Sequence, residues 1–131
     1  MWDDRRLEWF SRELLVRELD FAGTERLLAA TVEVGGAGPG PDWLARYLAA
    51  AGPAVARVAD PDRLSWNRAR YHIEMDGAGA WWLVRGPGRT EWPGSSAAAL
   101  RVAALTAALA IKWIGAGERP AEGAETRWRL A

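Results

Sequence analysis

The sequence predicts an α+β fold in which a small antiparallel sheet packs against helices. Within residues 69–85, a strand that alternates between polar and apolar side chains is followed by a glycine-containing turn and an apolar return strand, which is typical of a β-hairpin. Residues 96–114 are apolar apart from Ser96 at the start and three polar positions further along, which is typical of a buried helix. We expect the hairpin to form the centre of the sheet, and residues 1–131 to form a single domain.

An amphipathic helix over residues 3–21 is predicted to pack beside this core. Leu7 and Leu14 belong to an apolar stripe at helical spacing, and two acidic residues at its start suit the positive end of the helix dipole. Gly23 is placed to end the helix. The first six residues, Met1–Arg6, are charged and contain no apolar stretch, so we expect no signal peptide.

The segment after this helix gives mixed signals. Residues 26–34 alternate in a way that favours a strand, although the first half would also suit a helix. Residues 35–41 are rich in glycine and proline and predict a loop. Asp42 is placed to cap a short helix that ends at Gly52. Residues 53–60 fit either a further helical turn or a short strand.

The first strand of the hairpin gathers its apolar residues on one face. Tyr71, Ile73 and Met75 occupy alternate positions of the first strand. Trp81 and Trp82 are consecutive in the return strand, and successive strand residues point to opposite faces. One of these two tryptophans must therefore lie on the face directed away from the core.

The long apolar helix has a clear start, because Ser95 or Ser96 can cap its N-terminal end. Its length is at the lower limit for a membrane span, and Arg101 interrupts it. We therefore expect a core helix or a self-association surface and no membrane segment. Residues 125–130 alternate again and predict an edge strand, in which either Trp128 and Leu130 face inward or Arg127 and Arg129 pair with a partner.

The chain contains nine tryptophans but no cysteine and a single histidine. The absence of cysteine excludes disulfides, Cys-ligated zinc, iron–sulfur clusters and thiol nucleophiles. Seventeen basic and 17 acidic residues leave a formal net charge of zero, so no net field attracts nucleic acid. We expect no metal, no cofactor and a cytoplasmic location.

One group of ionisable residues has the composition of a catalytic or metal site. His72, Glu74 and Asp76 occupy alternate positions of the first hairpin strand, about 6.6 Å apart along the chain. Carboxylates alone would have to complete a metal shell, which disfavours a metal site. His72 and Glu74 are the candidates for an acid–base pair. Their simpler interpretation is a solvated strand face, and we favour a protein that is not an enzyme.

Tryptophans and arginines gather around the hairpin and are the candidate contact residues for a ligand or partner. They are Trp66, Arg68, Arg70, Trp81, Trp82, Arg85 and Trp92. Tryptophan is enriched at the energetic centres of protein interfaces, so an outward tryptophan on the hairpin would be an anchor.

The sequence therefore favours a non-catalytic module that binds a protein partner or associates with itself. Two alternatives stay open. In the first, tryptophans line a pocket for a small apolar ligand, and an arginine clamps its anionic group, with or without catalysis by orientation. In the second, residues 57–72 bind single-stranded nucleic acid, because arginines there are interleaved with aromatic residues.

Overall fold

The structure, a computed structural model, describes residues 21–117 and 127–130 of the chain. The helix predicted over residues 3–21 lies outside the described residues, except for its last position. The described part contains three helices and six strands. In chain order they are α2 (Phe21–Ala29), β1 (Thr31–Gly35), α3 (Pro39–Ala51), β2 (Ala54–Val58), β3 (Leu64–Trp66), β4 (Ala69–Met75), β5 (Trp81–Arg85), α4 (Ser96–Ala116) and β6 (Arg127–Arg129).

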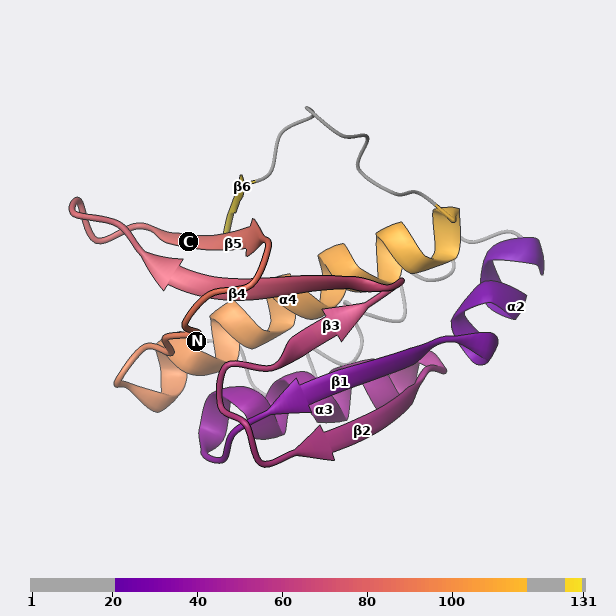
Figure 1. The fold of residues 1–131 in the computed structure, drawn as a ribbon, viewed down its shortest axis with the longest axis horizontal. Coiled ribbons are helices and arrows are strands. Elements are labelled where there is room, and N and C mark those ends of the chain that lie inside the picture. The colour runs from indigo at the N-terminus through magenta and orange to yellow at the C-terminus, as the bar shows by residue number, and fades with distance from the viewer. Residues whose placement is uncertain (1–20, 118–126, 131) are drawn as a thin grey trace.

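The strands form one sheet in the order β2-β1-β3-β4-β5-β6. β1 and β2 run parallel, and every other neighbouring pair is antiparallel. Figure 1 shows α3 and α4 on one side of this sheet. The predicted α+β fold is confirmed, with the hairpin of residues 69–85 forming β4 and β5. The sheet differs from the expected one in its single parallel pair.

That parallel pair arises because α3 connects β1 to β2, and parallel neighbours need such a crossover. α3 begins at Pro39, where the missing N–H leaves no helical bond unmade, and Gly38 is its N-cap. Residues 35–41 are therefore not all loop, which corrects the prediction. Asp42 is not the cap either, because it lies inside the first turn of α3. Its carboxylate instead accepts a hydrogen bond from the Arg57 guanidinium at 3.0 Å.

Residues 26–34 divide between a helix and a strand. α2 continues through Gly23 and occupies the first half, so the strand prediction is wrong there and right for β1. The helical half buries Leu27, which is only 1% exposed, and leaves its polar neighbours outside. The segment over residues 53–60 contains β2 and is a strand.

Two consecutive hairpins build the middle of the sheet. The predicted one places Ile73 opposite Leu83, and both side chains are fully buried. The other joins β3 to β4 through Asn67 and Arg68, whose φ angles are 51° and 62°. Two successive left-handed residues form the type I′ turn, whose twist matches that of the flanking strands.

α4 is capped at both ends, which confirms its predicted start. The Ser95 hydroxyl accepts a hydrogen bond from the Ala98 N–H at 3.2 Å, and Gly117 ends the helix in the left-handed conformation. By length and composition, α4 is the one helix of the described residues that could cross a membrane. However, 56% of the apolar 18-residue stretch of α4 is buried inside the protein, which is the environment of a core helix.

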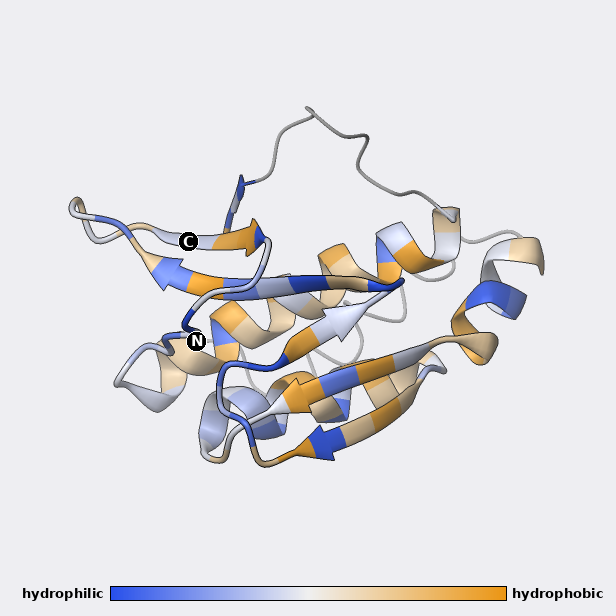
Figure 2. Cartoon of the chain, viewed as in Figure 1, coloured by the Kyte–Doolittle hydropathy of each residue, from blue (hydrophilic) through white to orange (hydrophobic). Residues whose placement is uncertain are grey.

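One hydrophobic core lies between the sheet and its helices. Hydrophobic and hydrophilic residues alternate along β1 and β4, as Figure 2 shows. The ring of Trp66 stacks on that of Tyr71 with centroids 3.8 Å apart, and Trp113 of α4 lies against both. Burial raises the pKa of the Tyr71 hydroxyl. The ring centroids of Trp128 and Trp113 lie 4.5 Å apart, which confirms the inward orientation of Trp128.

Candidate contact face of the sheet

The alternation that builds the core sends every second strand residue to the other side of the sheet. We call this side the open face, because no helix of the described residues lies over it (Figure 1). Its side chains are half-buried or exposed. Across β4, β5 and β6 they belong to Arg70, His72, Glu74, Trp82, Val84, Arg127 and Arg129.

The two consecutive tryptophans of β5 lie on opposite sides, as their adjacency requires. Trp81 packs against the core from the helix side. Trp82 lies on the open face, where Glu74 and Arg129 are its direct neighbours on the adjacent strands. The guanidinium carbon of Arg127 lies 4.5 Å from the Trp82 ring centroid, which is a cation–π contact. Trp82 is thus the aromatic centre of the open face.

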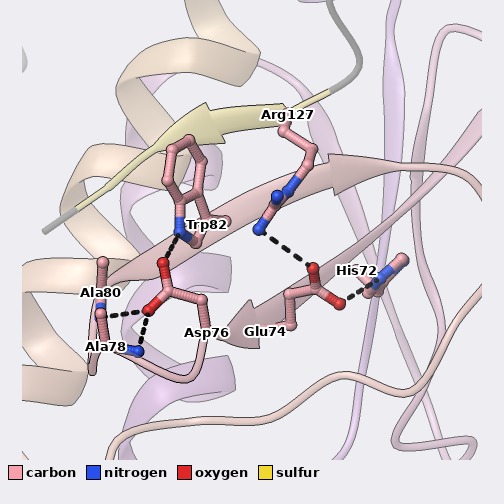
Figure 3. Close-up of polar contacts among 7 residues, drawn as sticks. All are labelled: His72, Glu74, Asp76, Ala78, Ala80, Trp82 and Arg127. Carbon is pink, nitrogen blue, oxygen red and sulfur yellow. Dashed lines mark hydrogen bonds and ion pairs between the residues drawn. The ribbon is translucent and has the colours of Figure 1, made fainter.

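Asp76 fixes both the hairpin loop and the Trp82 side chain (Figure 3). Its Oδ1 accepts the N–H groups of Ala78 and Ala80 at 2.8 and 3.0 Å, and its Oδ2 accepts the indole N–H at 2.8 Å. The bond from Trp82, followed by that from Ala80, holds the pKa of Asp76 below its ordinary value. Asp76 therefore anchors the loop and does not continue a row of ligands along β4.

His72 has an acceptor at each ring nitrogen. Nδ1 lies 3.0 Å from the carbonyl oxygen of Gly86, and Nε2 lies 3.3 Å from a carboxylate oxygen of Glu74. The other Glu74 oxygen lies 3.6 Å from Arg127 (Figure 3). An acid–base catalyst needs a ring nitrogen that reaches the substrate. Here both nitrogens face groups of this chain, so His72 ties its strand to the next connection.

That connection, residues 86–92, is a strap that crosses the open face from β5 toward α4 (Figure 1). The backbone N–H groups of Gly86 and Glu91 each donate to a β4 carbonyl at 2.7 Å. Between them, Gly88 lies so close to the imidazole of His72 that a Cβ there would be 2.6 Å from the ring. The strap leaves only 12% of the His72 side chain exposed.

A second polar cluster lies on the open face of β1 and β3. The Glu33 carboxylate accepts hydrogen bonds from Arg63 at 3.0 Å and from the Ser65 hydroxyl at 3.1 Å. These bonds, with that from Arg63 the stronger influence, hold the pKa of Glu33 below its ordinary value. Arg70 is the direct neighbour of Ser65 on β4 and adds a further favourable charge.

The structure separates the seven predicted contact residues. Trp66 is 1% exposed and belongs to the core, so its side chain is not available to a partner. Trp92 is half-buried and lies against Gly40 of α3, where a Cβ would overlap the indole ring. Arg85 faces the helix side, as the direct neighbour of Tyr71.

The remaining candidates differ in their positions. Trp81 is on the helix side, Arg68 is exposed at the turn between β3 and β4, and Arg70 and Trp82 belong to the open face. The candidate set omitted Arg127 and Arg129, which flank Trp82 on β6. The alternation of residues 125–130 was the signal that could have placed these two arginines on one face.

No group of three histidine or acidic side chains within the described residues could hold a metal ion. Comparisons of the chain with protein-family models, with curated proteins and with solved structures found no match. The open face is therefore interpreted from its own geometry.

The lowered pKa of Asp76 predicts a stability that depends on pH. A carboxyl group with a depressed folded-state pKa stabilises the fold above its unfolded-state pKa, and this stabilisation is lost as the pH falls through the folded-state value. We expect the Asp76 contribution to disappear below about pH 4. The difference in urea midpoint between the wild-type protein and Asp76→Asn, followed from neutral to acidic pH, measures it. A difference that stays constant with pH would contradict the assignment.

The left-handed conformation of Arg68 predicts that a glycine there stabilises the protein. A non-glycine residue in this region costs about 1–2 kcal/mol. Glycine avoids this cost, but its greater conformational freedom in the unfolded chain offsets part of the gain in stability. We expect Arg68→Gly to raise the free energy of unfolding by about 0.5–1 kcal/mol. Asn67→Gly is the matched control and should gain less, because asparagine tolerates this conformation better. A loss of stability in Arg68→Gly would rule out the strained turn.

Proposed function

We propose that the protein is a non-catalytic, self-associating interaction module of the cytoplasm, and that the open face around Trp82 binds a protein partner. One observation carries the proposal. The helices of the described residues cover a single side of the sheet, while the other side presents a half-buried tryptophan bordered by arginines. Tryptophan and arginine are the residues most enriched among those that dominate binding energy at protein interfaces. The lack of cysteine throughout the chain fits a reducing compartment.

The charges of the open face favour a partner with acidic groups. Arg127 is already shared between Trp82 and Glu74. Arg129 lies directly opposite Trp82 on β6. It is exposed and makes no ion pair with the described residues. A carboxylate of the partner placed beside Arg129 would gain a planar, two-pronged hydrogen-bond donor, and an adjacent apolar side chain would cover the indole.

The same face is less suited to nucleic acid. Trp66 and Tyr71, the aromatic residues that were expected to stack on bases, stack on each other inside the core. Glu33 and Glu74 place negative charge among the arginines of the face. Both carboxylates weaken the attraction of this face for a polyanion, whereas a folded protein with a mixed surface can match this alternating pattern.

The tryptophan-lined pocket has less support for a related reason. Trp66, Trp113 and Trp128 contact one another or Tyr71 in the core, where they fill space between the sheet and α4. Their arrangement is the packing of a hydrophobic core, in which aromatic rings stack or tilt against each other.

Site-specific photo-crosslinking in cells tests the proposed face. A crosslinking residue at Val84, beside Arg127 on the open face, is compared with one at Lys112, which is exposed on α4. We expect a discrete protein adduct from Val84 that is absent from Lys112, and that is weakened about tenfold by Arg129→Glu but not by Arg101→Glu on α4. Equal adducts from both positions, or insensitivity to Arg129→Glu, would overturn the proposal, as would an adduct made with nucleic acid.

A further inference from the structure

β2 is an edge of the sheet with no described strand on its outer side. It pairs with β1 alone, in parallel, over the continuous register Thr31↔Ala54 to Gly35↔Val58. The Ala54 N–H donates to Ala30 and the Val58 carbonyl accepts from Gly36, so these residues direct their backbone groups toward β1. The intervening Val55 and Arg57 therefore direct their N–H and C=O groups outward.

The two edges of the sheet are built differently. β6 has three residues, two of which are exposed arginines, and short charged edges resist pairing with another chain. β2 has five residues in unbroken register and a single charged side chain. That side chain, Arg57, is bound to its own chain, at 3.0 Å from Asp42 and 2.7 Å from the Gly36 carbonyl. Apart from Arg57 and the preceding Pro53, β2 thus lacks the features that keep a sheet edge unpaired.

We propose that β2 pairs antiparallel with β2 of a second copy of this chain, about a two-fold axis through Ala56, so that two six-stranded sheets join into one. The inference rests on the self-association in the proposed function and assigns a surface and a register to it. A two-fold interface uses the same patch on both copies, and antiparallel pairing of identical strands has this symmetry.

The register about Ala56 matches both the backbone and the side chains. Val55 of each copy lies opposite Arg57 of the other, and because these residues carry the outward groups, each such pair exchanges both of its N–H···O bonds. Ala56 faces its own counterpart at the axis, where opposite Cβ atoms approach most closely and a small side chain is suitable. The alkyl part of Arg57 then covers the partly buried Val55 across the interface.

The neighbouring registers of this strand pair are less stable. A two-fold axis at Arg57 would place two arginines directly opposite each other, which is destabilising. An axis at Val55 would place Pro53 opposite Arg57, and proline has no N–H to donate. A shift by one residue would bring side chains of the open face against those of the helix side.

α3 borders this edge with a face that carries small and paired side chains. Asp42 reaches Arg57 of β2, so the helix face that carries Asp42 lies toward the edge. Ala49 is seven residues further along α3, hence on the same face, and is exposed. The helix therefore presents a small side chain and an ion pair at this position.

A charge exchange at the axis tests the proposal. Ala56→Lys puts a lysine next to Glu33 within one sheet, which is favourable, but opposite a second lysine in the dimer. We expect sedimentation equilibrium to show a wild-type dimer and dimerisation of Ala56→Lys weakened about tenfold. Thr31→Lys is the matched control, because it adds the same charge one strand inward. An equimolar mixture of Ala56→Lys and Ala56→Glu should restore dimers.

The outcomes separate this inference from the proposed function. If the wild-type protein is dimeric but Ala56→Lys dimerises equally well, then the assembly uses another surface and the β2 pairing is overturned. If the wild-type protein stays monomeric at all concentrations, then both self-association and the β2 pairing are overturned. The crosslinking of the open face is decided independently in either case. Circular dichroism and thermal melting of each variant establish that it is folded.

Discussion

Replacing Trp66 with alanine should lower the free energy of unfolding by about 3–5 kcal/mol. Trp66 is 1% exposed and is the largest fully buried side chain of the described residues. Its ring stacks on Tyr71 with centroids 3.8 Å apart and lies 6.2 Å from Trp113. Truncation removes these contacts and leaves a cavity between β3, β4 and α4 that the surrounding sheet cannot close.

Trp82→Ala is the matched control, because it removes the same side chain from the other side of the sheet. Trp82 is half-buried, and its truncation removes one hydrogen bond to Asp76 and the contact with Arg127. We expect a cost of about 1 kcal/mol, with a separate loss of partner binding. Urea denaturation of both variants measures the difference. Equal losses of stability would contradict the assignment of Trp66 to the core and of Trp82 to the open face.

This pair of variants also shows what the sequence could and could not predict. Tryptophan composition gave no distinction between Trp66 and Trp82, since both belong to short segments that can form strands. Their sides are set by strand register, in which a shift of one residue moves a side chain across the sheet. The consecutive Trp81 and Trp82 were the exception, because adjacency alone requires that they lie on opposite faces.

Elements with strong local signals were predicted well. The hairpin of residues 69–85 has an alternating first strand, a turn and an apolar return strand, and α4 has a serine cap and a long apolar stretch. The edge strand β6 also followed from alternation. Each of these signals comes from residues close together in the chain, so no knowledge of distant contacts was needed.

The β1–α3–β2 unit was harder to predict because its strands are defined by each other. β2 alone is five residues of mixed character, and its parallel register with β1 depends on a crossover helix that begins within a glycine- and proline-rich segment. Pro39 started α3 where the composition indicated a loop. On the open face, Arg127 and Arg129 reach Trp82 only through the pairing of β6 with β5, which joins residues far apart in the chain.

The strand order explains why a substitution at Gly35 should have the second large effect on stability. The chain leaves β2 on one side of β1 and enters β3 on its other side, so the connection over residues 59–63 must pass the end of β1. It passes directly over Gly35, whose N–H donates to the Arg63 carbonyl at 2.7 Å. A Cβ at this position would overlap the carbonyl oxygen of Asp60 and lie 2.9 Å from that of Arg63. Both obstacles are backbone atoms, so no side-chain rotation relieves the contact.

Gly35→Ala should therefore lower the free energy of unfolding by about 3 kcal/mol, at the upper end of the cost of overpacking. Gly77→Ala, in the β4–β5 loop with open space around its Cβ position, is the control and should change stability by less than about 0.5 kcal/mol. Urea denaturation of both variants measures the two effects. If Gly35→Ala were as stable as the wild type, then the connection could not lie against the end of β1. A large loss confined to Gly35 would instead show that this crossing, which places β2 at the edge of the sheet, forms in solution.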